Sequence, residues 1–196
     1  MRSLAFTPTY GSSVCASFLQ PALSFSVGDG WRVPDKWPLE ATDVLYIEGA
    51  DGGELKFTSP LCVFVDLNTL SEEKEGPAPE NADKWQSWFQ GHPNLDISEP
   101  VPMCVGGVSG MRIEVTTTSA PRNYPRHHCE RPCVLLYQVS MAPVICSVEE
   151  RSKHWFVIVD VGGKTMVIDI SAPEDKFDEF LPRAQKVLDT VKWGTA

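Results

Sequence analysis

The residues with the most obvious chemical potential stand close together in one short segment. It contains His127, His128 and Cys129, with Cys133 four residues further on, and a third histidine, His154, begins a later apolar run. Thiolate and imidazole are the ligands that zinc prefers, usually with cysteines two to four residues apart. The same cysteines also suit a disulfide, and adjacent histidines on an extended chain point to opposite sides, so both seldom bind one ion. We favour a Cys129–Cys133 disulfide and keep His127, His128 and His154 as candidate metal ligands.

The cysteines also bear on the cellular compartment. Cys129 and Cys133 lie in a polar loop with several prolines, where two free thiols would be open to oxidation. Because disulfides persist in oxidising compartments, we expect an extracytoplasmic protein, secreted or at the cell surface, with the cytosol as the alternative. The first residues include one positive charge but no apolar run of the signal-peptide kind. The pairing of four cysteines stays open: Cys15, Cys62, Cys104 and Cys146.

The remaining catalytic patterns are weak. Ser109 lies in a glycine-rich run, residues 106–110, but it lacks the flanking glycines of a nucleophile elbow, and the run is typical of a hairpin turn. No spacing singles out a thiol–histidine pair. Asp160 and Asp169 stand at predicted strand ends, where we expect them to cap a hairpin. We therefore predict no catalytic residues and no cofactor; a metal- or thiol-dependent enzyme centred on residues 127–133 is the alternative.

Two of the six tryptophans are candidates for a binding surface. Trp31 and Trp37 stand beside glycine and proline in predicted loops, whereas most large aromatic side chains belong to the core. Exposed aromatic side chains often mark contact surfaces. We predict that Trp31 and Trp37 line a groove that receives a protein partner or a small apolar ligand.

The overall charge excludes some partners. The formal net charge is -9, and an acidic surface repels both nucleic acid and anionic membranes. No stretch approaches the ~18 consecutive apolar residues of a membrane span. We therefore expect no nucleic-acid partner and no transmembrane segment.

The elements that must position these residues are mainly strands. Alternating apolar residues predict strands at 23–27, 44–47, 55–57, 62–67, 102–105, 111–117, 134–137, 154–160 and 165–169. Gly162 and Gly163 predict a tight hairpin. Helical spacing of apolar residues predicts two amphipathic helices, one after an N-cap at Asn81 and one after a Ser171–Glu174 capping box.

We predict an α+β fold in which a single antiparallel (mixed) sheet is packed by the two amphipathic helices. Residues 1–20 are rich in Ser and Thr and are expected to form an irregular arm. Residues 21–196 are expected to form one domain.

Five segments occur in an order that resembles a known family. They are LSFSVGDGW (23–31), WFQGHPNL (88–95), PMCVGGVSG (102–110), CERPC (129–133) and FDEFLPRAQKVLDTV (177–191). Together they resemble an uncharacterised secreted or lipid-anchored protein family of actinobacteria and related soil bacteria, with a PsbP/Mog1-like fold. The resemblance implies an extracytoplasmic binding or accessory role without catalytic residues, and it supports the Cys129–Cys133 bridge.

Overall fold

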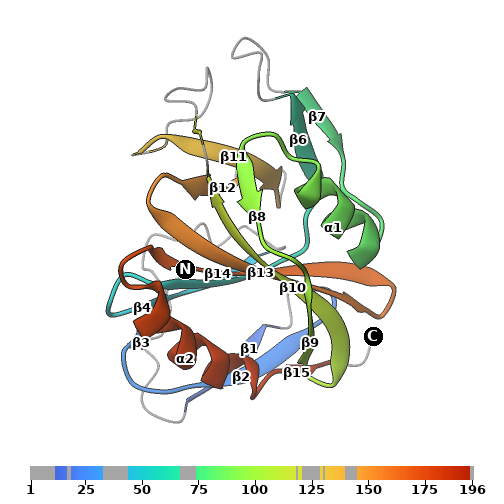
Figure 1. The fold of residues 1–196 in the computed structure, drawn as a ribbon. Helices are drawn as coiled ribbons and strands as arrows, with labels where there is room; N and C mark the ends of the chain where they lie inside the picture. Colours follow the sequence, from blue (N-terminus) through green and yellow to red (C-terminus); the bar gives the residue numbers. More distant parts are fainter. Residues whose placement is uncertain are drawn as a thin grey trace, which may run out of the picture.

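The chain is organised around a long antiparallel β-sheet that is covered on both faces (Figure 1). The computed structural model describes residues 12–16, 19–32, 44–66, 74–117, 119–120, 129, 131–139 and 145–194. Within these residues the central sheet runs in the order β3-β4-β5-β14-β13-β10-β8, with β9 also paired to β10. Its strands are β3 (Trp31–Arg32), β4 (Val44–Gly49), β5 (Glu54–Thr58), β8 (Leu95–Ile97), β9 (Val101–Val105), β10 (Val108–Thr117), β13 (Ser152–Val161) and β14 (Lys164–Pro173).

Two smaller antiparallel sheets flank the central one. The N-terminal sheet has the order β1-β2-β15, and the third sheet has the order β12-β11-β6-β7. Their strands are β1 (Ser12–Ala16), β2 (Leu23–Val27) and β15 (Lys192–Trp193), then β6 (Cys62–Asp66), β7 (Lys74–Pro77), β11 (Cys133–Gln138) and β12 (Ile145–Glu149). Because β1 pairs with β2 along its whole length, part of the expected irregular arm is strand.

Each face of the central sheet forms a separate hydrophobic core. The first core lies between one face and the N-terminal sheet with helix α2 (Phe177–Leu188). The second core lies between the other face and the third sheet with helix α1 (Ala82–Gln90). Adjacent residues of the long strands supply the two cores alternately: Val157 and Val159 of β13 belong to the first, and Phe156 and Ile158 to the second.

The prediction of a single sheet packed by two helices is wrong. The described chain is mostly β and has three antiparallel sheets, with only two α-helices. The physical reason is visible in β11, where Cys133–Tyr137 are all buried. A strand that is buried on both faces needs cover on both sides. Strand β11 and its neighbours in the third sheet therefore cover the second face of the central sheet. Helix α1 alone is too short to cover this face.

The helix and turn predictions have mixed outcomes. The Asn81 N-cap is confirmed, because its side chain accepts a hydrogen bond of 3.0 Å from Lys84 N. The Gly162–Gly163 hairpin is also confirmed, with φ values of 59° and 79°. The Ser171–Glu174 capping box is wrong, because β14 runs on to Pro173 and α2 begins only at Phe177. Continued pairing with β13 holds that segment in the sheet instead.

Candidate functional site

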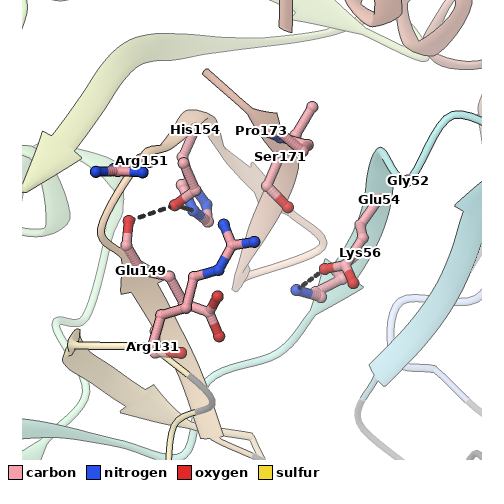
Figure 2. A pocket seen from close by; sticks show the side chains of 12 residues that line it. Gly52, Glu54, Lys56, Arg131, Glu149, Arg151, His154, Ser171 and Pro173 are labelled. Carbon is pink, nitrogen blue, oxygen red and sulfur yellow. Dashed lines mark hydrogen bonds and ion pairs between the residues drawn. The ribbon is translucent and has the colours of Figure 1, made fainter. Parts of the chain in front are cut away.

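A polar pocket opens between the central sheet and the third sheet, where β13 begins. Its volume is about 280 Å³. It is lined by Gly52, Glu54, Lys56, Arg131, Ser147, Glu149, Arg151, Ser152, His154, Ser171, Ala172 and Pro173. Figure 2 shows Glu54 and Lys56 on one side of this pocket and His154 on the other, with Ser171 between them. The lining is therefore dominated by charged and hydroxyl groups rather than by apolar side chains.

Strand alternation gathers these polar groups on one face. Four of them come from three adjacent strands, namely Glu54 and Lys56 of β5, His154 of β13 and Ser171 of β14, and Asp169 of β14 lies on the same face. The residues beside them in sequence pack into the first core, so these five face the third sheet. The register then forms two rows across the strands: Glu54, Ser171 and His154 lie opposite one another in the first, and Lys56 lies opposite Asp169 in the second.

A buried ion network forms the floor of the pocket. Lys56 Nζ lies 2.6 Å from Glu54 Oε2 and 3.6 Å from Asp169 Oδ2. Asp169 Oδ1 lies 2.8 Å from His154 Nδ1. Among the described residues, Asp169 Oδ2 accepts no hydrogen bond, so the longer contact with Lys56 is an ion pair only. The Asp169 side chain is only 1% exposed, so its charge depends on these two partners.

Neighbouring charges outweigh burial in this network. Burial alone would raise the pKa of Asp169, but the positive charges of His154 and Lys56 bring this pKa below its usual value. Burial would likewise raise the pKa of Glu54, yet Lys56 and Tyr46 lower it. The pKa of Lys56 is raised because Glu54 and Asp169 more than offset the opposite effect of burial. Lys56, Glu54 and Asp169 are therefore all charged at neutral pH.

The hydrogen bonds of Ser152 and His154 resemble a serine–histidine–aspartate relay, but the protons are arranged differently. Ser152 Oγ lies 2.9 Å from His154 Nε2 and 2.7 Å from the carbonyl oxygen of Glu149. A carbonyl only accepts, so the single hydroxyl proton is donated to Glu149, and Oγ then accepts from Nε2. Nδ1 donates to Asp169 at the same time. The hydroxyl proton that a serine nucleophile would pass to its histidine is therefore bonded to a carbonyl oxygen instead.

The third sheet and the turn after it provide the opposite wall. Tyr137 of β11 is fully buried, and its hydroxyl lies 3.2 Å from Thr58 Oγ1 of β5, which ties the third sheet to the central sheet. Cys133 pairs with Glu149 in the β11–β12 register. One step further on, Glu150 N donates a hydrogen bond of 2.8 Å to the carbonyl oxygen of Pro132. This ladder fixes the wall next to Arg131.

Two arginines stand at the rim of this wall. Arg131 and Arg151 are both exposed, and neither forms an ion pair with any residue in the described part of the chain. Arg151 has φ = 63°, a left-handed conformation that non-glycine residues rarely adopt. Its carbonyl oxygen accepts a hydrogen bond of 2.9 Å from Glu174 N. Residues held in such conformations often cluster at functional sites.

Arg131 also lies within the loop that Cys129 and Cys133 enclose. The structure pairs these two cysteines as a disulfide with Cα atoms 6.1 Å apart. We propose this bridge for the protein in solution. Of the four cysteines whose pairing was left open, Cys15 and Cys104 are exposed, Cys62 is half-buried and Cys146 is buried, and Cys15, Cys104 and Cys146 form no disulfide within the described residues.

The predicted site residues meet different environments. Trp31 is 4% exposed and packs on Phe180 of α2, with ring centroids 5.5 Å apart, so little of its surface is open to a ligand. Its role as a contact residue stays a prediction. His154 lines the polar pocket, where it contacts Asp169 and Ser152. Trp37, His127 and His128 lie outside the described residues.

The described residues do not form a metal-binding cluster. Within them, no three side chains of the His, Cys, Asp and Glu types are placed to hold a metal ion. The disulfide takes up both sulfurs of the proposed ligand set. Whether His127 and His128 bind metal stays a prediction.

The sequence reasoning missed the charged floor of the pocket. Asp160 behaves as expected near the hairpin, where Oδ1 accepts from Thr165 and Oδ2 from Ala82 N at the start of α1. Asp169 instead lies well inside β14, away from the turn. The available signal was a charge inside an apolar alternating run. Asp169 stands between two isoleucines, and Lys56 stands between leucine and phenylalanine on the next strand.

No protein-family model and no curated protein sequence matches the chain. Solved structures similar to it include cyanobacterial PsbP (CyanoP) from Synechocystis sp. PCC 6803. It is 12% identical with a TM-score of 0.47, covering 97% of this chain and 99% of that one. LpqN, involved in cell envelope biogenesis of Mycobacterium tuberculosis, is 13% identical with a TM-score of 0.36, covering 96% of this chain and 90% of that one.

At TM-scores below 0.5, neither likeness determines a function for this chain. The expected PsbP/Mog1-like resemblance has a counterpart in CyanoP. Membership of an actinobacterial secreted family stays a prediction, and so does the extracytoplasmic location. In the described part of the chain, neither helix has the length and apolar character that crossing a membrane requires.

Proposed function

We propose that the protein is a non-enzymatic binding domain that receives a small polar ligand in the pocket between the central and third sheets. The observation that carries this proposal is the buried floor of Lys56, Asp169 and His154, which presents fixed charges beneath an opening of about 280 Å³. Ligand sites combine a preformed cavity with a few placed polar groups. A cavity of this volume suits a small molecule rather than a protein segment.

The polar lining bears on the class of ligand. The prediction from sequence included a small apolar ligand or a protein partner, and neither is tested by the structure. Charged side chains line this pocket on both sides, and covering them with an apolar group would remove them from water without compensation. A polar ligand can replace the water that it displaces, so we favour it.

The same side chains argue against hydrolysis. A serine nucleophile needs a free neutral histidine to take its proton. Here the proton of Ser152 is engaged by the carbonyl of Glu149, and the His154 ring is held between Ser152 and Asp169. The Ser152–His154–Asp169 group therefore works as a rigid support for the pocket floor.

Two measurements on the full chain test this proposal. Calorimetric titration with inorganic phosphate, succinate, glycerol and betaine covers anionic, neutral and zwitterionic small molecules, and we expect at least one to bind with saturation. Hydrolysis of p-nitrophenyl acetate by the wild type and by Ser152→Ala is expected to be equal. Failure of every probe to bind would contradict the binding role. Hydrolysis that disappears in Ser152→Ala would contradict the non-enzymatic role.

A further inference from the structure

We infer that the pocket binds an oxyanion, a carboxylate or a phosphate group, between the guanidinium groups of Arg131 and Arg151. This inference rests on the proposed binding function and names its ligand class. Both side chains line the pocket and both are labelled in Figure 2. Carboxylate and phosphate share the paired oxygen atoms that a guanidinium group binds through two parallel hydrogen bonds.

Arg131 and Arg151 lie just beyond the paired ends of β11 and β12. Cys133 lies opposite Glu149, and the bond between Glu150 N and Pro132 O continues the ladder by one step. Arg131 and Arg151 are the next residues of the two chains beyond this bond, and both line the pocket. Two like charges that line one pocket repel each other, and an anion bound between them removes the repulsion.

The charges around the arginines leave them available for a ligand. Glu149 lines the same wall but lies within ion-pair distance of neither arginine, and no other acidic residue in the described part pairs with them. Glu54 and Asp169, the acidic groups of the floor, are already paired with Lys56 and His154. Two cations at one opening that pair with no acidic residue of the described part are unusual in a chain with a net charge of -9.

The backbone positions of the arginines are held before any ligand arrives. Arg131 is enclosed by the Cys129–Cys133 bridge, and Arg151 is held at φ = 63° with its carbonyl bound by Glu174 N. A non-glycine residue keeps this conformation only where the surrounding structure holds it there. Because the backbone is already fixed, only the two side chains must be ordered when a ligand binds. The hydroxyl of Ser171 points into the same space and supplies a third donor (Figure 2).

The test is calorimetric titration of the oxidised full chain with inorganic phosphate, succinate and glycerol at constant ionic strength. We expect at least one of the two anions to bind, and glycerol to bind more weakly or not at all. Phosphate tests for recognition of a phosphate group, and succinate tests for recognition of a carboxylate. Arg131→Gln and Arg151→Gln should each weaken anion binding about tenfold or more, the usual effect of losing a hydrogen bond to a charged group. Arg131→Lys and Arg151→Lys should recover part of the loss.

The matched control is Arg112→Gln, which removes one arginine from the other face of the central sheet, where it packs 3.8 Å above the ring of Trp155. It should leave anion affinity unchanged. Glycerol binding as tightly as the anions, with no effect of the two Arg→Gln changes, would overturn the oxyanion inference while the binding function stands. If the wild type binds none of the three probes and does not bind betaine either, the binding function itself is overturned.

Discussion

At the scale of single residues, the floor of the pocket depends on one carboxylate. Asp169 is almost fully buried and links Lys56 on one side to His154 on the other. Removing one partner of a buried charge group leaves the others without compensation, which costs ~3–5 kcal/mol. Asp169 is thus a structural requirement of the site.

The acid sensitivity of folding follows from the same group. The pKa values of Asp169 and Glu54 are lower in the folded chain than their usual values of about 3.9 and 4.3. Their contribution to stability is therefore fully present above pH ~5 and is lost as the pH falls through the folded-state values. Thermal unfolding of the wild type between pH 7 and pH 2 should show a falling Tm below pH ~4.

Two variants show whether these carboxylates cause that fall. Asp169→Asn should lower the Tm at pH 7 and should reduce the acid dependence, because the amide has no proton to take up. If Asp169→Asn does not fold, Glu54→Gln removes the more exposed carboxylate and tests the same relation. An unchanged acid dependence in a folded variant would show that other carboxylates are responsible.

At the scale of elements, the position of the pocket depends on how the third sheet meets the central one. The short strand β11 carries Cys133 at its first residue, and the bridge to Cys129 encloses Arg131. Cleavage by a dithiol or phosphine reductant breaks the S–S bond and yields two thiols, with two electrons taken from the reductant. The backbone of Arg131 is then held on one side only, through Pro132 and Cys133, because the link through Cys129 is lost.

We therefore expect reduction to weaken binding without unfolding the chain. Immobilising one long side chain costs ~0.5–1.5 kcal/mol on binding. The Cys129→Ser/Cys133→Ser variant should therefore bind the anionic probe roughly threefold to tenfold more weakly than the oxidised wild type. Calorimetric titration of both proteins measures this difference. Cys15→Ser/Cys104→Ser removes two exposed free thiols and is the matched control. Equal affinities in all three proteins would show that the bridge does not position the arginine.

The elements also show what could be predicted from the sequence and what could not. Local signals identified the strands around Phe156 and Ile168, the N-cap at Asn81 and the glycine hairpin, because each depends on neighbouring residues. The partition into three sheets depends on which strands pair over long distances, as in the pairing of β6 with β11, and no local pattern contains that information.

The candidate site was only partly within reach of sequence reasoning. Cys129 and Cys133 were recognisable from their spacing, and they flank Arg131, which lines the pocket. The approach of Lys56 to Asp169 depends on the pairing of β5 with β14, two strands that are more than a hundred residues apart in the chain. The sequence shows that Lys56 and Asp169 each stand inside an apolar strand, but it does not show that they pair with each other.

At the scale of the whole molecule, the central sheet separates two kinds of environment. One face packs into the apolar first core against α2 and the N-terminal sheet. The other face is apolar along most of its length and becomes polar beside the start of β13, where it meets the third sheet (Figure 1). The protein therefore holds a charged site within a rigid β scaffold, which favours recognition of a small ligand without large movements of the chain.

The most direct test of this account is NMR chemical-shift mapping of the oxidised full chain during titration with succinate and with inorganic phosphate. We predict saturable shifts in the backbone amides of Arg131, Ser152, His154 and Ser171, which line one pocket although they come from separate strands and turns. Amides around Gly107 and Lys192, at a separate cavity beside α2, should not move and provide the internal control. Saturable shifts confined to that second cavity, or no saturable shifts in any part of the chain, would contradict the assignment of the polar pocket as an oxyanion-binding site.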